Sequence, residues 1–586
     1  MKSSALSPII AAVVAFLKEK GVSEPIVMFD RPGLKGRGDI ATGIALRYAK
    51  ETGKKPLELA EEIAAHLSGA TIASIKSATA AAPGFINVHL SDAFYGDVLK
   101  EVLAKQETFG KNQTHKNEKW VIEHTSPNPN KAMHLGHLHN NLVGMSLANI
   151  IEWGGAHVVR DAIDNNRGIA IAKLMYGFLA LMKKDAGTPT DIAFWSEHRD
   201  AWFTPEEKNV TPDRFVTECY VFGSEAAKNP EADKQIRGMV VMWEAEDKLT
   251  WKLWEHVLGY SYQGMQRTLM RLGNKWDVIW HEHEIYKEGK RWVEEGLTKG
   301  VFKKLDDGAV LTDLSTYNLP DTIVLKADGT ALYITQDIAL TAQKKNTYHA
   351  DKLVWVVGPE QTLQLKQVFA VCEQLGIGKL SDFIHVPFGY VGLADEDGSF
   401  KKMSSREGTV VLIDDVIDVV KEKVSEKLET KNAEKAEKLA VGAVKFTILK
   451  ANKDQQITFS VERSIDVHGD SGVYVMYTYA RIRSLMRKAQ ERGIKATVGT
   501  CENGMSVMKE LYWFPNAIVR AGEDYSAHHI AQYLLELCGA FNAWYAQEII
   551  VDGGESEAHK VAVAQAASIV IKSGLSLLGI ETLEEI

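Results

Sequence analysis

Paired cysteines, long apolar runs and an excess of basic residues are all missing from this chain of 586 residues. Its four cysteines, Cys219, Cys372, Cys501 and Cys538, lie far apart and form no C-x-x-C pair. This spacing argues against a zinc knuckle and against a disulfide framework, and it fits a reducing compartment such as the cytoplasm. No apolar run reaches the ~18 residues that a membrane-spanning helix needs, so we expect no membrane span.

The net charge of −9 gives no general attraction for a nucleic acid. Such a partner would have to meet local basic patches, because binding depends on where lysine and arginine lie.

The apolar stretch from Leu6 to Leu17 resembles part of a signal peptide. No A-x-A-like cleavage site follows it, and Gly21 is placed as a helix C-cap. We therefore expect an amphipathic first helix there.

The length exceeds what one hydrophobic core serves, and three or four domains are expected. Residues 1–112 have the pattern of a small α/β domain. In it, residues 38–41 are predicted to open one helix, Pro56 to open another, and residues 83–90 to form a strand. From residue 466 to residue 586 the pattern is helical, and the segment 474–492 carries five basic residues and one acid.

Residues 113–465 combine buried strands with long helices, which predicts a Rossmann-like, doubly wound, mostly parallel sheet. Two of the strands are expected at residues 120–124 and 353–357. A helix-rich insertion is expected at about residues 185–295, which contain eight of the thirteen tryptophans. An aromatic stripe such as Trp251 and Trp254 packs into a core more often than it stacks on bases, and both uses stay open here.

The motif His134-Leu135-Gly136-His137 follows the strand at residues 120–124 and a loop rich in proline and asparagine. Gly136 allows the backbone to approach a ligand, and the N–H groups at a helix start favour anions. The two histidines would then donate hydrogen bonds to phosphate oxygens as negative charge develops. The alternative is a pair of histidines that only pack or cap the helix.

A second motif, Lys402-Met403-Ser404-Ser405, lies far downstream and follows the turn at residues 395–398. Cations and hydroxyls in a short loop can grip a pyrophosphate leaving group. Either motif alone is weak, but together in this order they indicate a nucleotide site.

The two motifs resemble the signatures of class I aminoacyl-tRNA synthetases, and the flanking residues narrow the resemblance to the arginyl-tRNA synthetase family. It extends over nearly the whole chain, through residues 83–87, 123–131, 328–337, 358–361, 474–482 and 577–580. The resemblance implies a class I catalytic domain at 113–465, an additional tRNA-binding domain at 1–112 and an all-helical, DALR-like anticodon-binding domain at 466–586. It also implies ATP-dependent ligation of L-arginine to tRNA(Arg) through an arginyl-adenylate.

The resemblance also assigns roles to residues. For ATP it points to Lys131, His134, Gly136, His137, Lys402, Met403, Ser404 and Ser405, with His134, His137 and Lys402 as catalytic residues. For arginine it points to Glu123, Asn128, Tyr333, Asp337 and Gln361. A guanidinium is best held by paired carboxylate contacts, which lysine cannot match. A structural salt bridge is the alternative use of Glu123 and of Asp337.

For tRNA, the resemblance points to Phe85, Asn87 and Arg481. An exposed base is read by stacking and hydrogen bonding, and a basic helix meets phosphates. ATP and Mg2+ are the expected cofactors, with no metal site on the protein, no zinc, a monomeric state and a cytoplasmic location. The family usually needs tRNA before it activates arginine.

Five positions depart from the family pattern, namely His139, Asn166, Ala170, Gln364 and Ser405. Two other interpretations therefore stay open: a different class I synthetase such as a cysteinyl enzyme, whose zinc-binding cysteines are missing here, and a catalytically idle RNA-binding paralogue.

Overall fold

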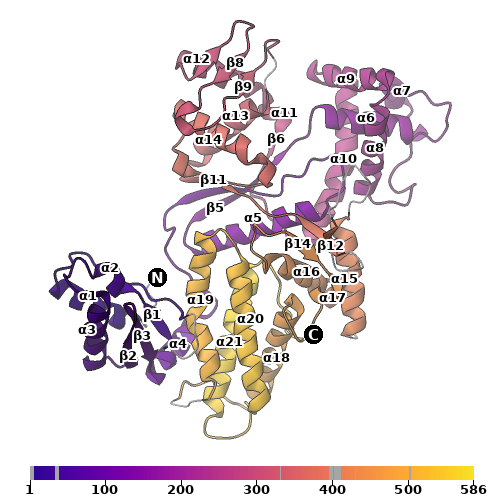
Figure 1. Ribbon diagram of the computed structural model, residues 1–586. Helices are drawn as coiled ribbons and strands as arrows, with labels where there is room; N and C mark the ends of the chain where they lie inside the picture. Colours follow the sequence, from indigo (N-terminus) through magenta and orange to yellow (C-terminus); the bar gives the residue numbers. More distant parts are fainter. Residues whose placement is uncertain are drawn as a thin grey trace. The chain divides into compact units, whose positions relative to one another are not determined.

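The computed structural model describes residues 6–32, 38–70, 72–329, 332–394, 400–401, 411–428, 431–499 and 503–586. The chain divides into two compact units (Figure 1). The first unit comprises Met1–Asn112, Asp466–Asp524 and His528–Ile586. The second comprises Gln113–Ile465 and Tyr525–Ala527.

A five-stranded parallel sheet forms the centre of the second unit, in the order β11-β10-β4-β5-β6. Its strands are β4 (Lys119–Glu123), β5 (His157–Asp164), β6 (Val278–His281), β10 (Lys352–Val356) and β11 (Phe383–Val386). The chain passes from β4 outward to β5 and β6, and later continues on the other side of β4 with β10 and β11. The predicted doubly wound parallel sheet is thus confirmed, and the order reverses between β4 and β10.

Both faces of this sheet are covered by helices. On one face α5 (Leu135–Trp153) packs Val143, Leu147 and Ile151 against Trp120 and Ile122 of β4. On the other face α13 (Tyr333–Tyr348) and α14 (Thr362–Leu375) pack around residues that include Val121, Leu353 and Trp355. Because side chains alternate along a strand, Glu123 points to the same face as Val121, the face covered by α13.

Shorter elements surround the sheet. A small antiparallel sheet joins β7 (Phe302–Lys304), β8 (Val310–Thr312) and β9 (Ile323–Leu325), preceded by α11 (Glu282–Ile285) and α12 (Gly289–Thr298). Another small sheet joins β12 (Val391–Ala394), β13 (Phe400–Lys401) and β14 (Ile457–Phe459). The helices α15 (Ile413–Lys427) and α16 (Ala433–Leu449) pack against each other, and α17 (Val461–Ser464) packs against both.

The helical insertion has its own hydrophobic core. It consists of α6 (Ile169–Leu181), α7 (Ile192–Glu197), α8 (Pro212–Ala226), α9 (Pro230–Glu244) and α10 (Lys248–Arg271). The predicted range of about 185–295 is therefore shifted, because the helices begin earlier and β6, which lies within that range, belongs to the parallel sheet. Trp195 and Trp202 are fully buried in it, and Trp243 stacks on Trp251 with ring centroids 5.2 Å apart. Trp254 is also buried, so these tryptophans serve packing.

The first unit combines a small α/β part with long helices. Its sheet has the order β1-β3-β2 and contains β1 (Ile40–Thr42), β2 (Ile75–Ala81) and β3 (Phe85–Leu90). The helices α1 (Ser7–Glu19), α2 (Ile44–Tyr48), α3 (Pro56–Gly69) and α4 (Asp92–Lys105) complete this part. The helix predicted to open at residues 38–41 is wrong, because residues 40–42 pair with residues 86–88 of β3.

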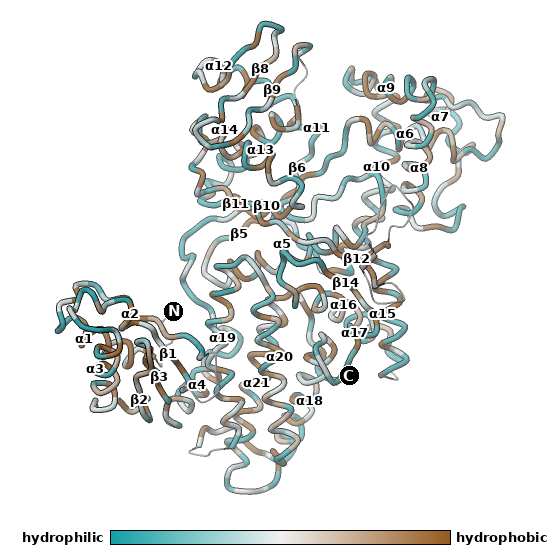
Figure 2. The backbone as a smooth tube through the Cα atoms, viewed as in Figure 1, coloured by the Kyte–Doolittle hydropathy of each residue, from teal (hydrophilic) through white to brown (hydrophobic). Residues whose placement is uncertain are grey.

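The remaining helices of the first unit are α18 (Gly472–Glu491), α19 (Met505–Glu523), α20 (His528–Gln547) and α21 (Glu557–Leu577). Figure 2 shows brown, hydrophobic residues along α20 and α21. Of the helices in the described part of the chain, only α21 is long and apolar enough to cross a membrane, and 83% of its most apolar stretch is buried inside the protein. That burial is the behaviour of a core helix.

Candidate active site

A cleft of about 1040 Å³ opens at the carboxyl ends of β4 and β10. It is lined by Glu123 at the end of β4, by Val357–Gln361 after β10, and by His134 and Gly136 at the start of α5. In open α/β sheets, ligands bind at the carboxyl ends of the strands where the strand order reverses. The position of the cleft therefore follows from the topology.

The two histidines of the first motif stand at the N-terminus of α5, where His134 is the N-cap residue. Their rings are stacked, with centroids 3.9 Å apart. The backbone N–H of Gly136 donates to His134 Nδ1, and that of His134 donates to His137 Nδ1, each over 3.2 Å. Because both Nδ1 atoms accept, the proton of each neutral ring lies on Nε2.

Both histidines are neutral at physiological pH. Burial lowers the pKa of His134 to about 4, and the nearby Lys131 ammonium adds to the effect. Burial, His134 and Lys131 together place the pKa of His137 well below its ordinary value. Burial also lowers the pKa of Lys131. The histidine pair thus offers two neutral N–H donors.

The second motif, Lys402-Met403-Ser404-Ser405, lies outside the described residues. The residues that follow it are hydrogen-bonded to the first motif. The Leu135 N–H donates to the Val411 carbonyl over 3.3 Å, and the Ile413 N–H donates to the Met133 carbonyl over 3.1 Å. His134 and Leu412 are the central pair of this short antiparallel bridge.

All five residues suggested for arginine line the cleft: Glu123, Asn128, Tyr333, Asp337 and Gln361. Tyr333 and Asp337 lie one turn apart on α13, as predicted, and Tyr333 is 74% exposed. The amide Nε2 of Gln364 donates to Asp337 Oδ2 over 2.6 Å. Enclosure in the cleft wall raises the pKa of Asp337 to about 7, a shift that the Gln364 hydrogen bond opposes.

Glu123 has a buried cationic partner as well. Lys344 Nζ lies 2.6 Å from Glu123 Oε2 and 2.8 Å from Asp161 Oδ2. Trp280 Nε1 also donates to Asp161 Oδ2, over 2.9 Å. Burial acts to lower the pKa of Lys344, but the two carboxylates outweigh it and raise the pKa, so the ammonium stays charged. Glu123 is therefore a cleft residue and a member of an ion pair at once.

One further acid, Glu282, lines the cleft and was missed from the sequence. It is 7% exposed at the start of α11, directly after β6, and Arg167 Nη1 lies 3.4 Å from its Oε1. Burial raises the pKa of Glu282, and Arg167 opposes the shift. An acid that follows a buried strand is the signal that identified Glu123, and it could have identified Glu282.

The residues suggested for tRNA lie in the first unit. Phe85 is 41% exposed at the start of β3, whereas Asn87 in the same strand is buried, so of these two residues Phe85 alone presents its side chain to the solvent. Arg481 on α18 lies over the rings of Tyr477 and Tyr545, at 5.1 and 5.3 Å from their centroids. These three residues line a cavity of about 680 Å³.

Three family models match the chain in succession. The model described as "Arginyl tRNA synthetase N terminal domain" matches residues 4–90, "tRNA synthetases class I (R), catalytic domain" matches residues 98–461, and "DALR anticodon binding domain" matches residues 475–586. The catalytic model alone covers more than half of the chain. The chain belongs to the arginyl-tRNA synthetase family.

Relatives and solved structures agree over nearly the full length. The chain is 33% identical over 598 residues to the arginine–tRNA ligase of Bacteroides thetaiotaomicron, with 98% of both chains covered. It is 32% identical over 571 residues to that of Treponema denticola, with 93% of this chain and 92% of the relative covered. The arginyl-tRNA synthetase of Thermus thermophilus has the same fold, with a TM-score of 0.80 at 22% identity over 99% of both chains.

Four of the departures from the family pattern lie in or beside the cleft of this synthetase. Gln364 is the residue that holds Asp337, and Ala170 lines the cleft. His139 is buried, with Nδ1 2.8 Å from the Gly389 carbonyl. Asn166 is buried too, and its Nδ2 lies 2.9 Å from Asp164 Oδ2 and from His283 Nδ1. The fifth departure, Ser405, lies outside the described residues.

Proposed function

We propose that the cleft carries out both steps of arginine–tRNA ligation, the activity of the family to which the chain belongs. One observation carries this proposal: the histidine pair and all five suggested arginine residues line one cleft at the point where the strand order reverses. An amino acid and a nucleotide bound there would meet with their reacting groups adjacent. Such positioning supplies much of the rate in transfers to phosphorus.

In the first step, the arginine carboxylate attacks the α-phosphorus of ATP. An arginyl-adenylate forms, the α–β phosphoanhydride bond breaks and pyrophosphate leaves. His134 and His137 donate their Nε2 protons in hydrogen bonds to phosphate oxygens, where negative charge grows in the transition state. Lys131 and Lys402 supply positive charge for the phosphates, with Gly136 and residues Met403, Ser404 and Ser405 completing the nucleotide subsite.

Arginine is recognised by its two cationic groups. Glu123 and Asp337 provide carboxylates in the cleft, Asn128 and Gln361 provide amides, and Tyr333 provides an exposed ring and hydroxyl. A planar guanidinium with five donors satisfies such an array, whereas lysine would leave buried acceptors without partners. This difference makes the site selective against lysine.

In the second step, the 2′-hydroxyl of the tRNA 3′-terminal ribose attacks the carbonyl carbon of the adenylate. The new ester forms, AMP leaves, and the hydroxyl proton passes to the released phosphate or to water. Arg481 with its tyrosines would contact the anticodon stem and loop, and Phe85 would stack on an exposed base of the D-loop, with Asn87 shaping the strand behind it. Activation of arginine would require tRNA to be bound.

Mg2+ would reach the cleft with ATP. Among the residues that the structure describes, no group of three histidines, cysteines or acids stands ready to hold a metal ion. Mg2+ commonly binds through substrate phosphates rather than a protein cage, which suits this cleft. We further propose a monomer without zinc that works in the cytoplasm. The buried free thiols of Cys219, Cys372 and Cys538 fit a reducing compartment.

The decisive experiment is charging of tRNA(Arg) by the purified protein with arginine, lysine or cysteine, and with pyrophosphate exchange measured with and without tRNA. We expect charging with arginine alone and exchange only when tRNA is present. A His137→Ala variant should lose at least 100-fold in charging rate, as when a transition-state donor is removed. The exposed His157, at the opposite end of β5, provides the matched control, His157→Ala. Normal charging by His137→Ala would refute the site assignment, and no charging at all would favour an idle paralogue.

A further inference from the structure

Two helices of the insertion hold the short bridge between residues 133–135 and residues 411–413. On the first side of the bridge, the Ala132 N–H donates to Thr217 Oγ1 of α8 over 2.7 Å. The same hydroxyl donates to the Asp213 carbonyl, one turn earlier in α8, over 2.6 Å. One hydroxyl therefore links the backbone that precedes His134 to the first turn of the insertion helix.

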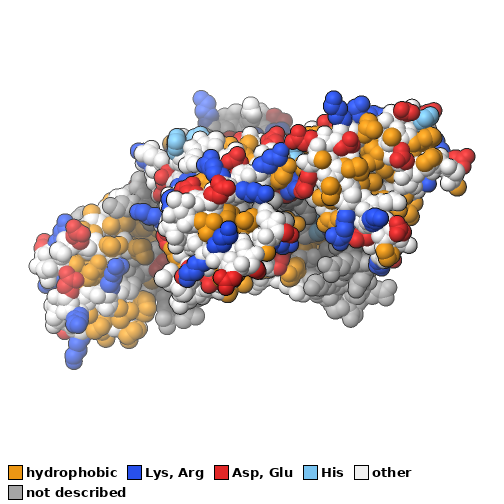
Figure 3. Space-filling view, turned by 90° about the horizontal axis from the view of Figure 1, so that it is seen from above, with side chains coloured by type: hydrophobic (Ala, Val, Ile, Leu, Met, Phe, Trp, Pro, Cys, Tyr) orange, Lys and Arg blue, Asp and Glu red, His pale blue; other side chains and the backbone are white. Residues whose placement is uncertain are grey.

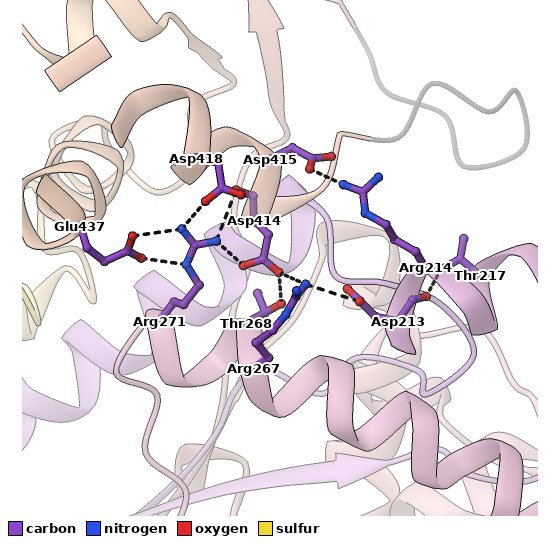
Figure 4. A network of polar contacts seen from close by, with 10 residues as sticks. All are labelled: Asp213, Arg214, Thr217, Arg267, Thr268, Arg271, Asp414, Asp415, Asp418 and Glu437. Atoms are coloured by element: carbon purple, nitrogen blue, oxygen red, sulfur yellow. Dashed lines mark hydrogen bonds and ion pairs between the residues drawn. The ribbon is translucent and has the colours of Figure 1, made fainter. Parts of the chain in front are cut away.

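On the second side, residues of α10 hold the start of α15. Thr268 Oγ1 donates to Asp414 Oδ2 over 2.6 Å, and Arg267 Nη2 lies 2.9 Å from the same oxygen. Arg271 contacts Asp414 over 2.7 Å, and it also contacts Asp418 and Glu437. Figure 4 shows these three carboxylates around the Arg271 guanidinium. Asp414 directly follows Ile413, a residue of the bridge.

The two sides are joined through α8 and α10. Arg267 Nη2 lies 3.5 Å from Asp213 Oδ1 as well as close to Asp414. The helices approach so closely at Gly264 that a Cβ there would lie 2.6 Å from the backbone nitrogen of Asp213. Asp213, Thr217, Arg267, Thr268 and Arg271 thus form one connected support.

The charged residues of this support pair with residues of opposite charge. Asp414 is buried and accepts from Arg267, Thr268 and Arg271. Burial acts to lower the pKa of Arg271, but the hydrogen bonds that its guanidinium donates to the carboxylates outweigh burial and raise the pKa. Asp414 itself is buried, so breaking its contacts would leave a buried charge without a partner, and this holds the local geometry.

We propose that these five residues of α8 and α10 form an insertion clamp that positions the nucleotide end of the cleft. The clamp fixes Ala132 before the first motif and Asp414 after the second, so it sets how the two chain segments meet at His134. Its members are positioning residues, since they act through the backbone of residues 132–135 and 411–413. The inference rests on the proposed assignment of ATP to His134 and His137, and it gives the insertion a part in catalysis besides packing.

The mildest test replaces one hydroxyl. Thr217→Val keeps the shape of the side chain and removes the acceptor of the Ala132 N–H, whereas Thr217→Ser keeps the acceptor. With saturating tRNA in the charging assay, we expect Thr217→Val to raise the KM for ATP about 10-fold while the KM for arginine changes less than twofold. Thr217→Ser should restore the KM for ATP to within about twofold of the original.

The second test acts on the other side of the clamp. Arg271→Met should raise the KM for ATP more than Thr217→Val does, and Arg271→Lys should recover only part of the loss, since an ammonium cannot contact three carboxylates as a fork does. The matched control is Arg214→Met. Arg214 also pairs across to α15, through Asp415, but both partners are about half exposed, so its removal should leave both KM values unchanged.

The results distinguish a positioning role of the clamp from a purely structural one. They also test the clamp separately from the assignment of the active site. Equal rises in the two KM values, or a lower Tm with unchanged KM values, would overturn the clamp. If Arg271→Met does not fold, the Thr217 pair decides alone. Failure of the proposed site is seen separately, as normal charging by His137→Ala, whatever the clamp variants do.

Discussion

Lys344 and Glu123 form a buried ion pair in the wall of the cleft, with Nζ 2.6 Å from Oε2 and the lysine side chain 1% exposed. A lysine buried to this extent is stable only when it is paired and hydrogen-bonded. Its second partner is Asp161, which Trp280 also holds. The pair fixes the carboxylate of Glu123 in one orientation.

Replacement of Lys344 by methionine should therefore weaken arginine binding. Without the ammonium, Glu123 and Asp161 face each other as two buried acids with no cation between them, and nothing holds the Glu123 carboxylate in its orientation. We expect the KM for arginine to rise about 10-fold or more. Lys344→Arg should keep the charge and most of the affinity.

The measurement is the KM for arginine at one pH, with the KM for ATP as the internal control. An equal rise in both KM values would instead indicate a general structural defect.

Asp337 should make arginine binding by the unaltered protein depend on pH. Its pKa is raised to about 7 in the empty cleft, and a bound cation requires the ionised form. The KM for arginine is thus expected to fall about 10-fold from pH 6 to pH 8 and to level off above. Asp337→Asn should raise the KM at pH 8 and abolish the slope. A slope that persists in the variant would assign the titration to another group.

The same substitution should stabilise the fold. The folded carboxyl keeps its proton up to a pH of about 7, whereas the unfolded one loses it near ~3.9, so its contribution to stability falls as the pH rises through that window. Asparagine avoids this penalty and can still accept from Gln364. We expect Asp337→Asn to raise the free energy of unfolding at pH 8 by about 1–2 kcal/mol, with the gain vanishing near pH 4, in calorimetry at the two pH values. A loss of stability at pH 8 would contradict this account.

Features encoded by local sequence were predicted well. The buried strand that ends at Glu123, the turn at Gly136 and the helix that starts beside it each carry their own residue signals, and the sheet topology then brings them to one cleft. The strand at residues 40–42 was missed because it forms by pairing with residues elsewhere in the chain, chiefly with β3.

Partners across the fold could not be predicted. Lys344 lies next to Lys345 in the sequence, yet one is buried against two acids and the other pairs with Asp382 nearer the surface. The contacts of Arg271 with Asp414 join elements separated by more than a hundred residues. On the face shown in Figure 3, basic and acidic side chains are interspersed. The sequence around a charged residue therefore does not show which opposite charge it pairs with. The roles of Lys402 and Ser404 stay predictions.

The histidine pair should act as neutral donors rather than as acids. Both Nδ1 atoms accept backbone N–H groups, and the pKa of His134 is lowered to about 4. Nitrogen-15 spectra of histidine-labelled protein should therefore show two Nε2–H tautomers at pH 7. His137→Asn, which keeps an N–H donor, should retain more charging activity than His137→Ala, which should lose about 100-fold or more. A protonated ring at pH 7, or equal losses in both variants, would contradict the neutral-donor account.

Arg481 should contribute to tRNA binding and to neither small substrate. Its guanidinium is held between Tyr477 and Tyr545 and bonded to Asn542, so it is pre-oriented in a cavity with aromatic walls. A cation beside aromatic faces suits an RNA phosphate next to an unstacked base.

Arg481→Met should raise the KM for tRNA about 10-fold. It should also reduce the dependence of that KM on salt concentration, because one phosphate contact is lost. The control Arg237→Met removes an exposed arginine of α9 that pairs only within its own helix turn, with Asp233, and should leave the KM for tRNA unchanged. A rise in the KM for arginine in Arg481→Met would instead mean that the residue acts on the cleft through the fold, and an unchanged salt dependence would mean that the pocket binds no phosphate.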